Sequence, residues 1–155
     1  MAKIKDILSI KLEADIKSVI NLNSQDEKDI LEELNAFILT ESLAKHLSDF
    51  CDFYGSGTQQ AGLWLSGFYG SGKSYFAKMI GMLLNDRTIV GTPMRERFVP
   101  KLSGLKNANI LANSITSLGR TPNHVVLFDS ANETGEYGIS YMMMAAFLRS
   151  LGFLE

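Results

Sequence analysis

The stretch most suited to a specific chemistry is Gly67–Ser74, GFYGSGKS, which fits the phosphate-binding loop pattern G-x-x-x-x-G-K-[ST]. Glycine permits positive φ angles and lets the backbone approach a phosphate closely. Successive N–H groups from about Gly70 to Ser74 can then converge on phosphate oxygens, helped by the positive end of the following helix. Lys73 supplies a mobile cation for the β- and γ-phosphates, and the Ser74 hydroxyl suits Mg²⁺. These residues predict a nucleotide phosphate site.

The candidate binding residues form one continuous set. They are Gly67, Phe68, Tyr69, Gly70, Ser71, Gly72, Lys73, Ser74 and Tyr75. Ser74 is also the candidate metal ligand, and the expected cofactors are ATP and Mg²⁺. The alternative is a glycine-rich turn with an incidental lysine, which the flanking sequence argues against.

Both flanks of the loop support this interpretation. Before it, Leu63, Trp64 and Leu65 form a short apolar run, which predicts a buried parallel strand. After it, apolar residues recur at helical spacing and predict one buried helix face: Phe76, Ala77, Ile80, Leu83 and Leu84. The loop is therefore expected between a strand and a helix.

A second candidate for metal chemistry is Asp129, which ends the apolar run Val125–Phe128. This run predicts another buried strand, and an acid at such a strand end can bind Mg²⁺ in nucleotide hydrolases. Ser130 follows, where many ATPases carry the catalytic glutamate. We interpret Asp129 first as a cap of the next loop and second as a Mg²⁺ partner, so the catalytic residues stay unassigned.

The cysteine and the two histidines indicate no further site. Cys51 is the single cysteine, which excludes an internal disulfide and a multi-cysteine metal site. It falls on the apolar face of a predicted helix, which indicates a buried, unreactive thiol. His46 and His124 are far apart and lack the spacing of metal ligands.

Length and charge set broad limits. The 155 residues suggest one domain, long enough to bury a core. The formal net charge of −2 excludes a global basic field that would attract nucleic acid. The N-terminus lacks the uninterrupted apolar core of a signal peptide, and no apolar run approaches transmembrane length. We expect a cytoplasmic protein without membrane contact.

Two segments organise the chain, a helical prefix over residues 1–60 and a nucleotide-binding segment over 61–155. In the prefix, Ser24–Glu27 has the spacing of a capping box and predicts a helix start. Thr40 suits the N-cap of a second helix, which ends at a polar link, Gly55–Gln60. The second segment predicts further helices over Met94–Leu102, Leu105–Leu118 and Ile139–Leu151.

This order of elements is typical of the opening of an α/β nucleotide-binding fold with a parallel sheet. We therefore predict a helical prefix followed by the start of a P-loop NTPase parallel-sheet core, incomplete because only two or three strands can be found. The last predicted helix is apolar nearly all round, which indicates packing between a sheet and another element. We expect the chain to be the N-terminal piece of a longer protein.

Four stretches also point to one family. They are Ile4–Ile7 with Ile16–Ile20; Glu32–Leu34 leading through Thr40-Glu41 to Leu43–Leu47, similar to T-R-E-L-x-x-H; Leu63–Phe76, similar to W-V-S-G-F-F-G-S-G-K-S-H-F; and Val125–Asp129 with Phe147–Phe153. Together they resemble the N-terminal region of the P-loop protein of bacteriophage-exclusion (BREX) defence systems, the BrxC/PglY family. Trp64, Phe68 and Phe76 make the resemblance specific, because phosphate binding does not require them.

The resemblance implies a multidomain parent ATPase that acts with other BREX proteins against phage, with any DNA contacts outside this chain. It also implies that Asp129 lies one strand before the acidic Mg²⁺ residue, so no catalytic acid or arginine finger carries over. The sequence departs from the family where Glu41-Ser42 replaces Arg-Glu and Tyr75 replaces His. We therefore expect ATP binding without hydrolysis by this chain alone.

Two other functions stay open. A small P-loop phosphotransferase would need an acceptor pocket and a lid with clustered arginines. The arginines of the middle third lack a lid-like glycine-rich loop: Arg87, Arg95, Arg97 and Arg120. A non-catalytic assembly module would dock a partner through the helical prefix, with nucleotide only ordering the fold.

Overall fold

The computed structural model describes residues 26–57, 62–120, 122–129 and 138–153. Along the chain the elements are α1 (Glu27–Ala36), α2 (Glu41–Gly55), α3 (Lys73–Asn85), β1 (Thr88–Ile89), β2 (Thr92–Pro93), α4 (Met94–Phe98), the 3₁₀ helix η2 (Val99–Leu102), α5 (Ala108–Ser117), the 3₁₀ helix η3 (Leu118–Arg120) and α6 (Ile139–Ser150). The fold is therefore mostly helical.

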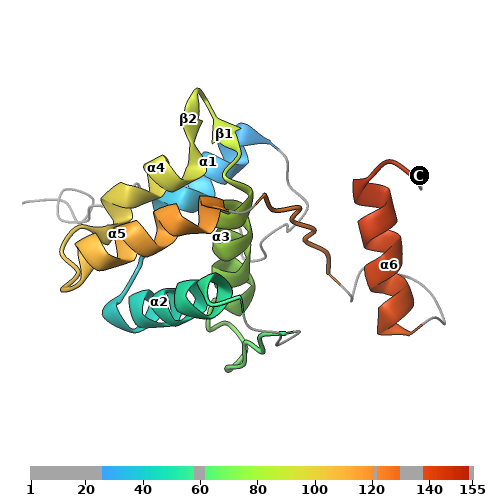
Figure 1. Ribbon diagram of the computed structural model, residues 1–155, viewed down its shortest axis with the longest axis horizontal. Helices are drawn as coiled ribbons and strands as arrows, with labels where there is room; N and C mark the ends of the chain where they lie inside the picture. The colour runs from blue at the N-terminus through green and yellow to red at the C-terminus, as the bar shows by residue number, and fades with distance from the viewer. Residues whose placement is uncertain (1–25, 58–61, 121, 130–137, 154–155) are drawn as a thin grey trace, which may run out of the picture.

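Helices α1 to α5 form one packed unit, and α6 stands to one side of it (Figure 1). Within the unit, α2 runs along α5, while α3 contacts α4 and η3. The extended segment 122–129 leads from the unit toward α6 (Figure 1). The phosphate loop precedes α3, so the packing of this helix decides where the loop lies.

One core of buried apolar side chains joins the helices of this unit. Its members are Ile30, Leu34, Phe37, Leu39, Ala44, Leu47, Cys51, Phe76, Met79, Leu83, Ile89, Met94, Phe98, Leu102, Leu111, Ile115 and Leu118. Many recur three or four residues apart, as one face of a helix requires. Full burial of a leucine or phenylalanine side chain contributes roughly 1.5–3 kcal/mol. The core includes residues from both segments defined by the sequence, 1–60 and 61–155.

The helix starts follow local capping chemistry. Thr40 is the N-cap of α2, as predicted, and its Oγ1 accepts a hydrogen bond from Leu43 N at 3.3 Å. Asp26 caps α1 and accepts from Lys28 N at 2.8 Å. The predicted first cap, Ser24, lies outside the described residues, as do the stretches near residues 4–22.

The later predicted helices form with small changes at their ends. The helix predicted over Met94–Leu102 is α4 continued by η2, and Pro93 directly precedes it. The helix predicted from Leu105 begins three residues later as α5 and tightens into η3. These segments confirm the helical periodicity of the sequence.

The predicted α/β fold class is wrong for the part of the chain that the structure describes. Its one sheet is the antiparallel hairpin β1–β2, in which Thr88 pairs with Pro93 and Ile89 with Thr92. The predicted strand Leu63–Leu65 is not a strand, and the Trp64 side chain is 90% exposed rather than buried. A strand needs a neighbour for its backbone N–H and C=O groups, and an apolar run alone does not supply one.

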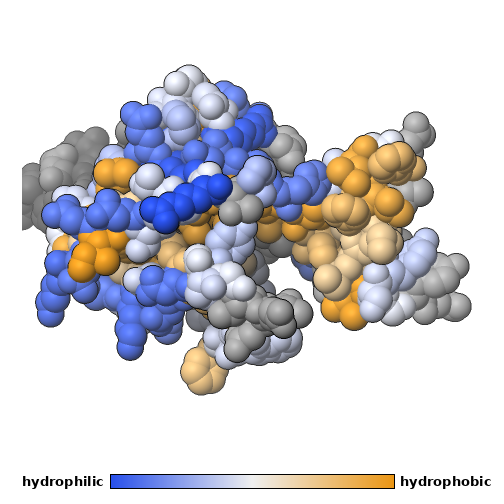
Figure 2. Space-filling model, in the orientation of Figure 1, coloured by the Kyte–Doolittle hydropathy of each residue, from blue (hydrophilic) through white to orange (hydrophobic). Residues whose placement is uncertain are grey.

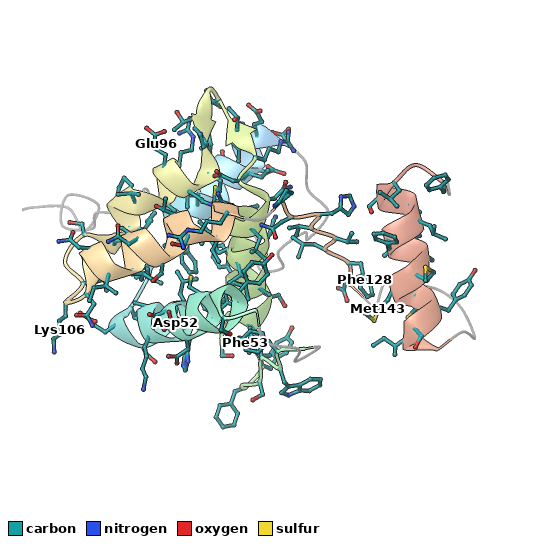
Figure 3. All side chains as sticks on the ribbon, in the orientation of Figure 1. Asp52, Phe53, Glu96, Lys106, Phe128 and Met143 are labelled. Atoms are coloured by element: carbon teal, nitrogen blue, oxygen red, sulfur yellow. The ribbon has the colours of Figure 1, made fainter. Side chains whose placement is uncertain are left out.

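The second predicted strand, Val125–Phe128, is also unpaired and packs against α3 instead. A Cβ on Gly81 would lie 3.1 Å from Leu127 Cδ2 and 3.3 Å from Val125 Cγ1, so this segment lies directly on the helix. Figure 3 places Phe128 at the end of the segment nearest α6. The apolar side chains of this run therefore pack on a helix and not within a sheet.

Helix α6 forms where the sequence predicts it, but its predicted packing against a sheet is wrong. Ala146 is buried, whereas most of the large apolar side chains are exposed: Ile139, Tyr141, Met143, Met144 and Phe147. Figure 2 shows this helix as the largest apolar area on the visible face. His124 connects to it, with Nε2 2.8 Å from Ser150 Oγ. None of the helices in the described ranges is long and apolar enough to span a bilayer.

Candidate functional site

The phosphate loop has the backbone that its sequence predicts. Gly70 and Gly72 have φ angles of 77° and 81°, in the left-handed region that glycine adopts without strain. Between them the chain turns, and Ser71 N donates to Phe68 O at 3.2 Å. Helix α3 then begins at Lys73, directly after Gly72. The prediction of a glycine turn opening a helix is confirmed.

The interior of the loop is tight at its first glycine. A Cβ on Gly67 would lie 3.0 Å from Ser71 Oγ and 3.7 Å from Lys73 Cδ, so a side chain here would crowd the loop. The ammonium of Lys73 folds back across the loop, and its Nζ donates to Phe68 O at 2.8 Å. A cation and a group of backbone donors therefore lie together at one helix start.

The first turn of α3 has backbone N–H groups without a partner inside the helix, as the first turn of every α-helix does. The first helical hydrogen bond runs from Phe76 N to Gly72 O at 2.9 Å, so the N–H groups of Lys73, Ser74 and Tyr75 precede the helical ladder. The positive end of the helix dipole adds to their attraction for an anion. The loop residues from 62 to 72 are all exposed, so a ligand can reach these donors.

The structure separates one predicted site residue from the rest. The Tyr75 side chain turns to α1, where its hydroxyl donates to the backbone carbonyl of Glu33. Its ring meets Phe37 edge-on, with the centroids 5.2 Å apart. Burial, with the nearby charge of Glu33, raises the pKa of Tyr75 to about 12, so the hydroxyl stays a donor. Only its backbone remains near the loop.

Sequence reasoning missed a buried ion pair beside the site. Lys78 Nζ lies 2.6 Å from Glu33 Oε2, and the Lys78 side chain is 1% exposed. Lys78 stands between Phe76 and Met79, which face the core. The sequence did hold a signal of this pair, because Lys78 lies within the apolar stripe of the helix. A lysine buried there needs an acidic partner.

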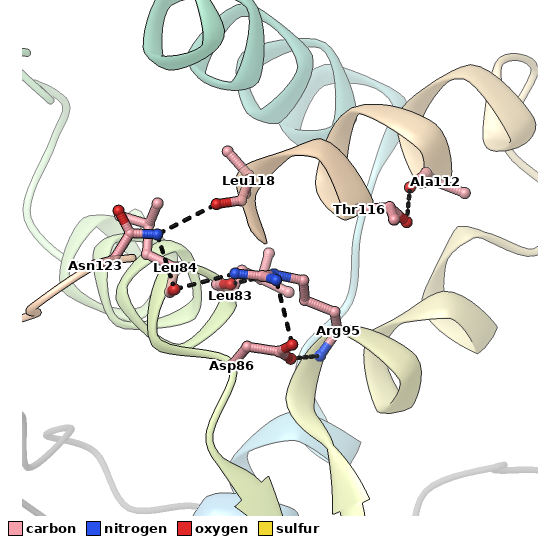
Figure 4. Close-up of polar contacts among 8 residues, drawn as sticks. All are labelled: Leu83, Leu84, Asp86, Arg95, Ala112, Thr116, Leu118 and Asn123. Carbon is pink, nitrogen blue, oxygen red and sulfur yellow. Dashed lines mark hydrogen bonds and ion pairs between the residues drawn. The ribbon is translucent and has the colours of Figure 1, made fainter. Parts of the chain in front are cut away.

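The other end of α3 is closed by a polar cluster, shown in Figure 4. Arg95 Nε donates to Leu83 O at 2.8 Å, and its Nη2 donates to Leu84 O at 3.1 Å. Asp86 holds the same arginine, with Oδ2 3.2 Å from Nη1. Asn123 Nδ2 also donates to Leu84 O at 3.2 Å. The last carbonyls of α3 thus have partners, as a helix end requires.

Two of the arginines considered for a lid serve the fold. Arg95 belongs to the cluster just described, and Arg97 donates to Ile89 O at 2.8 Å and to Val90 O at 2.9 Å. Asp129, the other candidate for metal chemistry, is exposed at the end of segment 122–129. Among the described residues, no group of three or more His, Cys, Asp and Glu could hold a metal ion.

Cys51 is buried in the core, as predicted. Burial raises the pKa of this thiol to about 11, and the charge of Asp52 adds to the shift. The thiol is therefore protonated at neutral pH and unsuited to act as a nucleophile.

No family model matches the chain, and no solved structure matches it at a significant level.

Proposed function

We propose that this chain binds Mg·ATP through the loop Gly67–Ser74. The observation that carries the proposal is the backbone of the loop, with positive φ at Gly70 and Gly72 immediately before the first turn of α3. Such a turn directs successive N–H groups to one point and places them at the positive end of a helix. The donor set suits a polyphosphate.

Each residue of the loop has a stated role in this proposal. Backbone N–H groups from Gly70 to Ser74 donate to phosphate oxygens, for which the N–H of Ser71 gives up its bond to Phe68 O. Gly67 keeps the interior free of a side chain. Lys73 exchanges the Phe68 carbonyl for phosphate oxygens, and the Ser74 hydroxyl ligates Mg²⁺. When bound, ATP supplies a transferable phosphoryl group, and Mg²⁺ neutralises charge on it.

The chain is further proposed to be the ATP-binding N-terminal part of a BREX-type phage-defence ATPase in the cytoplasm, acting with other BREX proteins. The support is the sequence resemblance, above all at Trp64 and Phe68. Their side chains are 90% and 91% exposed, which suits contact with a partner protein. The lone Cys51 and the intracellular supply of ATP support the location. Copurification with BREX proteins, weakened by Trp64→Ala, tests this assignment; unchanged copurification contradicts the role given to Trp64.

A phosphotransferase is less well supported, because Arg95 and Arg97 are held by backbone carbonyls and not gathered over the loop. A non-catalytic module shares the ATP site with the leading proposal and differs in turnover. We expect the chain alone to bind ATP without steady hydrolysis. Phosphate release that is lost in Asp129→Asn would contradict this.

Calorimetric titration with Mg·ATP tests the proposed site. Lys73→Ala removes a charged donor worth roughly 1.5–3 kcal/mol, so affinity should fall about 10- to 150-fold. Lys45→Ala is the matched control, because Lys45 is an exposed lysine on α2. Equal affinity of the Lys73→Ala and Lys45→Ala proteins would contradict the proposal.

A further inference from the structure

Two side chains from the first turns of α3, Tyr75 and Lys78, contact Glu33 of α1. Its backbone carbonyl accepts the hydrogen bond from the Tyr75 hydroxyl, and its carboxylate pairs with Lys78 Nζ at 2.6 Å. Tyr75 and Lys78 are three residues apart, so they lie on the same side of the helix. Tyr75 directly follows the two loop residues with proposed ligand contacts, Lys73 and Ser74.

This attachment is buried. The Lys78 side chain is 1% exposed and the Glu33 side chain 13% exposed, so water reaches the ammonium hardly at all and the carboxylate only in part. If α1 moved away, Lys78 would lose its ion pair with Glu33, and breaking a buried ion pair is costly. The edge-on contact of Tyr75 with Phe37 closes the same junction, and Phe37 belongs to the core. Three contacts therefore hold the first turns of α3 at this junction: the Tyr75 hydrogen bond, the Lys78 ion pair and the ring contact with Phe37.

The rest of α3 is held from other directions. Gly81 is covered by Leu127 and Val125, and the cluster around Arg95 fixes the carboxyl end. The loop itself is exposed and has few such supports. The first turns of α3, which carry the loop donors, are thus held by the core contacts of Phe76 and Met79 and by the junction with α1.

We infer that Tyr75 is a positioning residue for the phosphate loop, and that the docking of α1 through Glu33 orients the donors that receive the nucleotide. The inference rests on the proposed ATP binding and extends it by naming the element that regulates the site. Coupling of this kind is reciprocal. Nucleotide that orders the loop should tighten α1, and a partner that displaces α1 should weaken nucleotide binding.

Tyr75→Phe tests the inference, because it keeps the ring against Phe37 and removes only the hydroxyl. Tyr54→Phe is the matched control: the Tyr54 hydroxyl donates to Asn123 Oδ1, and Asn123 contacts the other end of α3. In ligand-free protein, amide hydrogen exchange at Ser71 and Phe76, whose N–H groups donate to Phe68 O and Gly72 O, should become roughly 2- to 10-fold faster in Tyr75→Phe and stay unchanged in Tyr54→Phe. Mg·ATP affinity should fall in the same pattern.

A purely structural role would lower the melting temperature in both variants without a selective change in loop exchange. Unchanged loop exchange in Tyr75→Phe therefore overturns the inference, whatever the ATP titration gives. Absence of ATP binding in the wild-type chain would refute the proposed function, and the exchange experiment would still decide the positioning role.

A second variant keeps the inference testable if the Tyr75→Phe protein folds poorly. Glu33→Gln combined with Lys78→Met removes both charges of this ion pair at once, so neither remains without the other. It should give the same faster exchange at Ser71 and Phe76. Exchange rates equal to those of wild type would count against the inference in this variant also.

Discussion

Gly119→Ala should destabilise the fold by displacing Arg95 from the end of α3. A Cβ on Gly119 would lie 2.1 Å from Arg95 Nη1 and 3.1 Å from its Cζ, which no structure tolerates without movement. The guanidinium cannot move freely, because it donates to Leu83 O and Leu84 O and pairs with Asp86. Losing two or three such bonds, each worth roughly 0.5–1.5 kcal/mol, predicts a cost of about 1–4.5 kcal/mol.

Urea unfolding of four proteins measures this effect: wild type, Gly119→Ala, Arg95→Ala and the double variant. Once Arg95 is shortened, the added methyl has room, so Gly119→Ala should cost little in the Arg95→Ala background. Gly62→Ala is the matched control, since a Cβ there meets nothing within 4 Å. Full additivity of the two single changes, or a Gly119→Ala cost no larger than that of Gly62→Ala, would refute the reasoning.

Three further predictions follow from single side chains. Ser74→Ala should weaken binding of Mg·ATP far more than binding of ATP in EDTA, by calorimetry, because the hydroxyl belongs to the metal shell; equal losses would assign Ser74 to the helix start alone. Val90→Asn should stabilise by about 0.5–1 kcal/mol in urea unfolding, because Val90 has φ of 45° in the turn of the hairpin and asparagine tolerates this region. The control is Val99→Asn at an exposed valine with a φ of −50°, where the substitution should not raise the free energy of unfolding. Equal stabilisation by the two substitutions would contradict the claim that Val90 is strained. For Cys51, whose pKa is raised from 9.0 to about 11, the unfolded thiol ionises first, so the free energy of unfolding should fall as pH rises from 9 toward 11. Cys51→Ala should remove the contribution of the thiol to this fall in stability. An identical pH dependence of the unfolding free energy in both proteins would contradict the raised pKa of Cys51.

The features that could be predicted from the sequence have local causes. The cap at Thr40 and the loop Gly67–Ser74 each depend on residues within a few positions, and both appear as expected. The helix after the loop follows from apolar spacing in the same way. Local side-chain chemistry decides these elements before any tertiary contact forms.

The failures involve distant partners. Whether Leu63–Leu65 and Val125–Phe128 become strands depends on neighbours elsewhere in the chain, and an apolar run does not specify them. The hairpin turn Val90–Gly91 lacks the usual Asn-Gly signal, so it was missed. The junction of Glu33 with Lys78 joins residues far apart in the sequence, and only the folded core brings them together.

The most direct test of the central claim is a titration of ¹⁵N-labelled protein with Mg·ATP, followed by amide chemical shifts. Nucleotide binding at this loop predicts saturable shifts concentrated at Gly70, Gly72 and Ser74, with the amide of Met143 on α6 unmoved. In Lys73→Ala the same shifts should need about 10- to 150-fold more Mg·ATP. Saturable shifts centred elsewhere in the chain, or no shift at the three loop amides at millimolar Mg·ATP, would contradict the claim that this loop is a nucleotide site.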